Sequence, residues 1–252
     1  MNKIGIFGDS FGTNSLGPFG THTPKDLVEE YRSWIDLIGT THSYARGGTD
    51  IQWSFLEFEK HHNDYDQIIF IITNPFRITL KDENDDKKLF KMISGTDWKL
   101  GFQNDNGGYT SPKDNDIETQ YTLKALAELE KILIINNSYR ERASLFHSLT
   151  IERIKQIRPD VKFIAAFPLT DLQIPLMNNC LQDITDYENK IMKWKSVDNR
   201  HDTRIAHLTE KSHIILTKLI KEWLKTDEMF FDFDMKEFDN INPDRNKYDA
   251  SR

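Results

Sequence analysis

The sequence predicts an α/β fold built on a central parallel sheet. Three short, mostly apolar runs at 3–7, 67–73 and 161–167 are rich in β-branched and aromatic residues. Such runs are typical of strands that are buried on both faces. Helical patterns lie between them, and strands that alternate with helices indicate βαβ units whose helices cover a parallel sheet.

The expected helices are recognised by apolar residues that recur every three or four positions. The first three patterns are Leu27, Tyr31, Trp34, Ile35 and Ile38; Ile51, Phe55 and Phe58; and Leu181, Ile184, Ile191 and Trp194. Two consecutive helices are also expected from 119 to about 157, and a final one from about 210 to 224.

The chain is expected to form one domain over residues 1–225, followed by a tail at 226–252. Residues 78–117 interrupt the alternation of strands and helices with a polar, turn-rich stretch that is too long for an ordinary connection. We expect an insertion over one face of the sheet, either a lid or a surface loop. The tail contains eight acidic and four basic residues with four Phe and one Tyr. It is expected to be solvated or partly docked, with a partner-binding segment as the alternative.

Composition narrows the classes of function. The net charge of −7 argues against a nucleic-acid-binding surface, and no apolar run reaches the roughly 18 residues of a membrane span. The N-terminus lacks the apolar region of a signal peptide, and the one cysteine, Cys180, cannot form an internal disulfide. A cytoplasmic protein is therefore expected, and association with a virion is also compatible with these features.

The segment Gly8-Asp9-Ser10 directly follows the first predicted strand. The carboxyl end of a parallel strand is the edge at which open α/β sheets bind ligands. Glycine permits a tight turn there, and a serine hydroxyl in such a turn becomes a nucleophile when a base lies near it. The surrounding residues match neither of the common glycine-rich phosphate-binding patterns.

Three further segments strengthen this interpretation. Gly47 and Gly48 precede a predicted helix, where a backbone N–H can point at a developing oxyanion. Asn74 follows the second predicted strand and can donate its side-chain amide to the same oxyanion. His207 stands just before the last predicted helix, for which Thr209 is the expected N-cap.

Together these four segments resemble, in order and spacing, those of the SGNH (GDSL-type) hydrolases, including some phage-encoded members. The resemblance covers about residues 3 to 225, except the insertion and the region around 170 to 200. It implies a three-layer α/β/α sandwich of the flavodoxin-like type and an esterase activity that needs no metal or cofactor. Members of the family are mostly esterases, lipases, thioesterases and carbohydrate deacetylases. Small acyl esters are the expected substrates of this chain, with O-acetyl groups of carbohydrates first among them.

The resemblance also implies roles for individual residues. Ser10 would be the nucleophile and His207 the general base, while the N–H groups of Ser10 and Gly48 and the amide of Asn74 would form the oxyanion hole. Gly47 is the alternative to Gly48 in this alignment.

Residues that adjoin these segments are expected to bind substrate: Asp9, Arg46, Gly47 and Arg77. The two arginines would contact an anionic or sugar substrate, and the alternative for each is a plain surface arginine.

Two features depart from the family pattern. Asn74 lacks the usual neighbours of the family's third segment, and Arg204 occupies the position, three residues before His207, where the family has an aspartate. A guanidinium cannot accept the imidazole N–H and would disfavour the imidazolium. Three alternatives remain: Asp202 orients His207, a Ser-His dyad operates without a carboxylate, or the chain is a non-catalytic module with the same fold.

Overall fold

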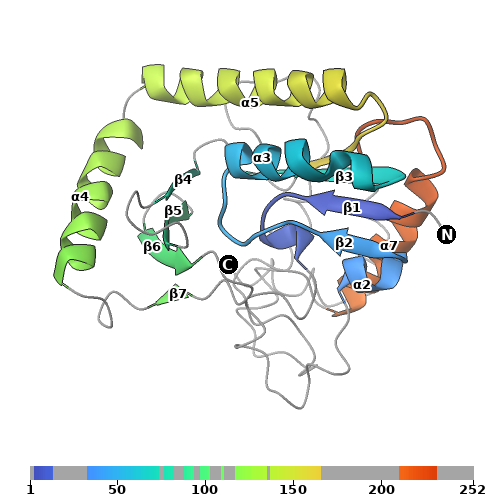
Figure 1. Cartoon of the computed structure of the whole chain (residues 1–252), viewed down its shortest axis with the longest axis horizontal. Coiled ribbons are helices and arrows are strands. Elements are labelled where there is room, and N and C mark those ends of the chain that lie inside the picture. Colours follow the sequence, from blue (N-terminus) through green and yellow to red (C-terminus); the bar gives the residue numbers. More distant parts are fainter. Residues whose placement is uncertain are drawn as a thin grey trace, which may run out of the picture.

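The computed structural model of the chain contains a parallel β-sheet with helices on both faces (Figure 1). The expected α/β class is confirmed. The structure describes residues 3–13, 33–73, 77–81, 88–93, 97–102, 109–110, 117–134, 137–165 and 210–231.

The main sheet has four strands in the order β2-β1-β3-β8, and all neighbouring strands are parallel. Their bounds are Ile4–Phe7 for β1, Thr41–Ser43 for β2, Gln67–Ile72 for β3 and Lys162–Ala165 for β8. β1, β3 and β8 coincide with the three predicted apolar runs. β2 was not predicted, because its three residues Thr-His-Ser are polar and none is buried.

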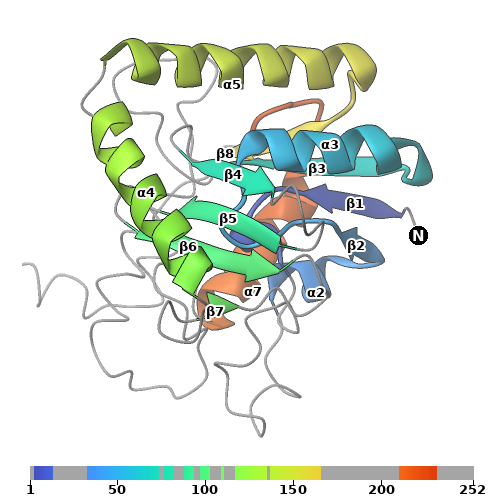
Figure 2. The ribbon, with the colours of Figure 1, turned by 60° about the vertical axis from the view of Figure 1, so that its left-hand side comes forward.

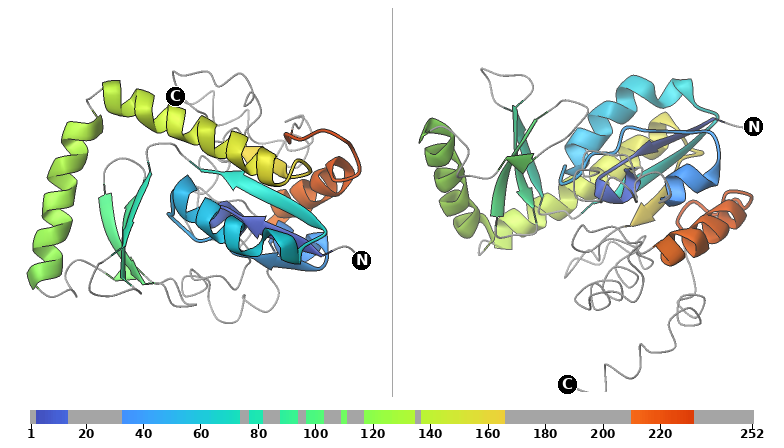
Figure 3. Two further views of the ribbon diagram at one scale, coloured as in Figure 1. Left: turned by 45° about the horizontal axis from the view of Figure 1, so that its top comes forward. Right: turned by 90° about the horizontal axis from the view of Figure 1, so that it is seen from below.

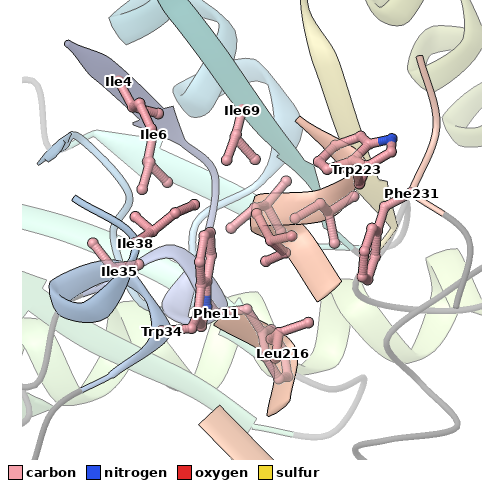
Figure 4. Close-up of a cluster of buried hydrophobic side chains, with 13 residues drawn as sticks. Ile4, Ile6, Phe11, Trp34, Ile35, Ile38, Ile69, Leu216, Trp223 and Phe231 are labelled. Carbon is pink, nitrogen blue, oxygen red and sulfur yellow. The ribbon is translucent and has the colours of Figure 1, made fainter. Parts of the chain in front are cut away.

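One face of the sheet packs against α2 (Trp34–Ile38) and α7 (Glu210–Trp223). Ile6, Ile69 and Ile164 point from three different strands into one buried cluster with side chains of both helices, which Figure 4 draws in close-up. These three isoleucines are fully buried, so each contributes on the order of 2 kcal/mol to folding.

The opposite face packs against α3 (Ile51–His61) and α5 (Asn137–Ile157). Phe7, Phe70 and Phe163 alternate with the isoleucines along the strands and point into this second cluster. Since successive side chains of a strand point to opposite faces, a strand in such a sheet must be apolar at nearly every position.

The helices predicted from 51, from 119 to 157 and from 210 are confirmed as α3, α4 (Ile117–Ile134), α5 and α7. Short 3-10 turns η1 (Ser10–Gly12) and η2 (His62–Asp64) follow β1 and α3. Trp34, Ile35 and Ile38 form α2, whereas Leu27, Tyr31 and the predicted helix at 181–194 lie outside the described residues. No helix in the described ranges is long and apolar enough to cross a membrane.

The predicted insertion contains a second sheet. Its strands are β4 (Ile78–Lys81), β5 (Lys88–Ile93), β6 (Asp97–Phe102) and β7 (Tyr109–Thr110), paired antiparallel in sequence order. These strands were not predicted, although apolar and polar residues alternate in Ile78–Lys81 and Asp97–Phe102, which is the pattern of a half-buried strand. Figures 2 and 3 show this sheet between α4 and the carboxyl ends of the main strands, rather than over a face of the main sheet.

The beginning of the predicted tail is docked against the main sheet. Beyond α7, the N–H of Phe231 donates to the carbonyl of Phe163 (2.9 Å), and the N–H of Phe163 donates to the carbonyl of Met229 (2.8 Å). The side chain of Phe231 is buried, and Phe230 stacks on Phe163. The chain at 229–231 therefore lies beside β8 like a further strand, and residues 232–252 are outside the described ranges.

We predict that the buried His147 of α5 makes folding sensitive to acid. Burial lowers the pKa of its imidazole to about 3 from an ordinary value of 6.5, and its Nδ1 has no hydrogen-bond partner in the described structure. Between these two pKa values the unfolded chain binds a proton that the folded chain does not. The free energy of unfolding therefore falls as the pH drops below about 6.5, by up to about 1.4 kcal/mol per pH unit.

Urea unfolding of wild type and His147→Leu between about pH 7 and pH 5 measures this contribution. The variant should show a shallower fall in the free energy of unfolding across this interval, and equal slopes for the two proteins would contradict the prediction.

Candidate active site

The candidate site lies at the carboxyl end of β1, where the order of the strands reverses. β2 pairs with one edge of β1 and β3 with the other, so the chain leaves β1 toward one side and returns on the other. In open α/β sheets such a reversal leaves a crevice at the carboxyl ends of the strands, and ligands bind there.

The turn after β1 requires glycine at position 8. Gly8 has φ of +145°, and a Cβ at this position would lie 2.6 Å from Cβ of Ile71 and 2.9 Å from its carbonyl oxygen. Both the backbone conformation and the neighbouring strand exclude a side chain. Ser10 then begins the 3-10 turn η1, which extends to Gly12.

Asp9 is fully buried beneath this turn. Its Oδ1 accepts from the N–H of Phe11 (3.1 Å), and its Oδ2 lies 2.5 Å from Nη1 of Arg77. The Arg77 side chain is only 8 % exposed, so both charges of this pair are withdrawn from water. Nη1 of Arg77 also donates to Oγ1 of Thr73 (2.9 Å), which in turn lies 3.2 Å from Oδ2 of Asp9.

The segment before α3 is held against the same turn. The N–H of Arg46 donates to the carbonyl of Gly8 (3.0 Å), and the hydroxyl of Ser43 donates to the carbonyl of Gly12. Gly48 is buried with φ of +74°, a left-handed conformation that favours glycine. These contacts bring the paired glycines to the same edge of the sheet as Ser10.

Asp50 links α3 to the second sheet. It caps the helix by accepting from the N–H of Trp53 (2.8 Å), and its other carboxylate oxygen accepts from the N–H of Thr79 in β4 (2.7 Å). Burial raises the pKa of Asp50 in spite of these hydrogen bonds. The guanidinium of Arg46 lies over the ring of Trp53, 5.4 Å from its centroid.

The structure thus brings together six of the predicted site residues at one edge of the sheet: Asp9, Ser10, Arg46, Gly47, Gly48 and Arg77. For Ser10 it describes the backbone. The other predicted members of the site lie outside the described residues, namely Asn74, Asp202 and His207, as does Arg204.

Asp9 and Arg77 are buried, whereas Arg46 is partly exposed to solvent. The first two were expected to bind substrate, but they are buried against each other, which favours a role in shaping the turn. Arg46 is partly exposed, so direct contact with substrate remains a prediction for this residue.

Two threonines at the site were missed by the sequence analysis. The hydroxyl of Thr73 contacts Asp9 and lies 3.4 Å from the carbonyl of Thr49, whose own hydroxyl donates to the carbonyl of Arg46 (2.7 Å). Their positions in the sequence could have identified them. Thr73 ends the apolar run at 67–73, and Thr49 directly follows Gly47 and Gly48. Within the described ranges, no cluster of three or more His, Cys, Asp or Glu side chains is arranged to hold a metal ion.

Comparison of the chain with protein-family models, curated proteins and solved structures finds no match. The interpretation of this site therefore depends on its residues and geometry.

We predict that Asp9 and Arg77 are strongly coupled in stability. Arg77→Met leaves the Asp9 carboxylate buried without its cation and should lower the free energy of unfolding by about 3–5 kcal/mol. Adding Asp9→Asn removes the uncompensated charge, so the double variant should be more stable than Arg77→Met alone. Urea unfolding of the two single variants and the double variant gives the coupling energy.

The matched control is Lys60→Met, which removes an exposed ion pair with Glu57 and should cost less than about 1 kcal/mol. Additive effects of the two site substitutions would show that the buried pair does not organise this edge of the sheet.

Proposed function

We propose that the chain is a serine ester hydrolase of the SGNH type, acting through an acyl intermediate on Ser10. The observation that carries the proposal is the turn after β1, which places Ser10 directly after a buried, ion-paired aspartate at the strand-order reversal. A buried ion pair at this place makes the turn rigid, and a nucleophile needs a fixed position relative to its base and its oxyanion donors.

The arrangement of strands supports the finer fold assignment in this proposal. The order β2-β1-β3-β8 corresponds to the first four positions of the flavodoxin-like order 2-1-3-4-5. The segment 229–231 takes the next place, beside β8. With α2 and α7 on one face and α3 and α5 on the other, the core agrees with a three-layer α/β/α sandwich.

In the proposed reaction, Oγ of Ser10 attacks the ester carbonyl while His207 takes the hydroxyl proton. The carbonyl oxygen becomes an oxyanion, which the N–H groups of Ser10 and Gly48 and the amide of Asn74 stabilise. Collapse of this intermediate breaks the bond to the alcohol, and His207 returns its proton to the leaving alkoxide. Water, deprotonated by His207, then releases the acid and restores Ser10.

Small acyl esters are the proposed substrates, with O-acetyl groups on carbohydrates first among them. Arg46 and Trp53 support this choice, because the partly exposed pair lies beside Gly47 and Gly48 and offers both a hydrogen-bond donor and an aromatic ring. A guanidinium binds sugar hydroxyls or an anionic group, and aromatic rings commonly line small-molecule sites.

The alternative from another class is a non-catalytic binding module with the same fold. Arg204 favours it, because a cation replaces the carboxylate that the family uses to orient the histidine. The two proposals differ in whether Ser10 reacts covalently.

We predict that wild-type protein hydrolyses p-nitrophenyl acetate and is labelled by a fluorophosphonate probe, and that Ser10→Ala abolishes both. The expected loss in kcat is about 10⁴-fold or more, since removing the nucleophile removes the covalent step. The control Ser148→Ala, which removes a half-buried hydroxyl on α5, should retain both activities. Wild-type protein that neither reacts with the probe nor hydrolyses any short-chain ester would contradict the hydrolase proposal.

We predict separately that Asp202→Asn distinguishes a triad from a dyad. If Asp202 orients His207, kcat should fall by about 10⁴-fold with little change in KM, as for a carboxylate that fixes the histidine tautomer. Steady-state kinetics of Asp202→Asn beside Asp198→Asn, the next acidic residue upstream, measures this. A loss of less than tenfold in Asp202→Asn would assign the reaction to a Ser-His dyad.

A further inference from the structure

The backbone of Phe11, the residue after Ser10, is held from two directions. Its N–H donates to the carboxylate of Asp9, and its carbonyl accepts from the indole Nε1 of Trp34 (2.9 Å). Phe11 is 5 % exposed and Trp34 is 1 % exposed, so water does not compete for these hydrogen bonds. Figure 4 shows Phe11 and Trp34 together, with α2 and α7 around them.

Trp34 is in turn bound by α7. The N–H of Trp34, at the first position of α2, donates to Nδ1 of His213 (3.2 Å), and His213 is 5 % exposed. Since Nδ1 accepts this hydrogen bond, the ring proton is on Nε2. The first N–H groups of a helix have no partner within the helix, so His213 supplies an acceptor that α2 needs at a buried end.

The position of His213 in the sequence connects this contact to the proposed base. His213 is the fourth residue of α7, which begins at Glu210. His207 precedes Glu210 by three residues, a length of chain that spans at most about 11 Å. The proposed base therefore lies close in the sequence to the residue that binds Trp34.

We propose that His213 is a positioning residue for the active site: through Trp34 it holds the backbone of Phe11, and with it the η1 turn in which Ser10 lies. The inference rests on the proposed function and adds a residue that neither the Gly8-Asp9-Ser10 pattern nor the SGNH resemblance identifies. The hydrogen bonds run from α7 to α2 and from α2 to η1, and each uses a directional donor and acceptor. Apolar packing alone would tolerate sliding of α7 along the sheet, whereas these two hydrogen bonds do not.

Two substitutions separate the hydrogen bond from the packing. His213→Leu fills the site but cannot accept from Trp34, whereas His213→Asn places an amide oxygen close to the position of Nδ1. The matched control is His147→Leu, which replaces the other fully buried helical histidine of the described structure, one whose Nδ1 makes no hydrogen bond.

We expect His213→Leu to lower kcat for p-nitrophenyl acetate and the rate of fluorophosphonate labelling by about tenfold, because small displacements of reacting groups are costly. KM should change by less than about twofold. His213→Asn should recover most of the lost kcat, and His147→Leu should leave kcat unchanged. In the same variants, hydrogen exchange of the Trp34 indole N–H, followed by NMR, should be faster in His213→Leu than in His213→Asn.

If the wild-type protein is active, two results would overturn the positioning role. One is an unchanged kcat in His213→Leu, and the other is an equal loss of kcat in His213→Asn and His213→Leu. If His213→Leu does not fold, His213→Gln is used in its place, because the amide oxygen of glutamine lies away from the position of Nδ1. A kcat of His213→Gln equal to that of His213→Asn would then overturn the positioning role. Wild-type protein without esterase activity would instead overturn the proposed function. The hydrogen-exchange measurement does not require esterase activity, so it still tests the contact between His213 and Trp34.

Discussion

The buried ion pair between Asp9 and Arg77 is the interaction on which the candidate site depends. Removing two charges from water is costly, and the cost is recovered only when the pair and its remaining hydrogen-bonding groups are satisfied. Here Asp9 also accepts from the backbone of Phe11, and Arg77 also donates to Thr73 at the end of β3. The pair therefore joins the turn after β1 to the segment after β3, and Thr73 extends the contact to Thr49 before α3.

This arrangement explains why three separate segments meet at one edge of the sheet. Parallel strands deliver their carboxyl ends to the same side, but strand pairing by itself does not fix the loops that follow. Gly8 permits the first loop to pass tightly over Ile71, and the Asp9 carboxylate then sets the conformation of the next two residues. Trp34 holds the carbonyl of Phe11, so the residue that follows Ser10 is fixed at both its N–H and its carbonyl.

The sequence predicted the parts of the fold that depend on local patterns. β1, β3 and β8 are apolar runs, and α3, α4, α5 and α7 show helical spacing, so each is recognisable from its own residues. β2 is too short and polar for such a signal, and its pairing with β1 comes from the fold. The second sheet was missed because its short strands stand within a polar, turn-rich stretch, although Ile78–Lys81 and Asp97–Phe102 show the alternation of a half-buried strand. The pairing of Arg77 with Asp9 joins residues 68 positions apart, and no periodic pattern in one sequence reports such a contact.

The central claim is that this edge of the sheet presents Ser10 as a nucleophile. The most direct test is to react native wild-type protein with a fluorophosphonate and locate the adduct by tandem mass spectrometry of its peptides, with urea-unfolded protein as the reference. The account predicts a single adduct on Ser10 that forms in the native protein and is absent after unfolding. An adduct on another residue, or equal reaction of Ser10 in native and unfolded protein, would contradict it.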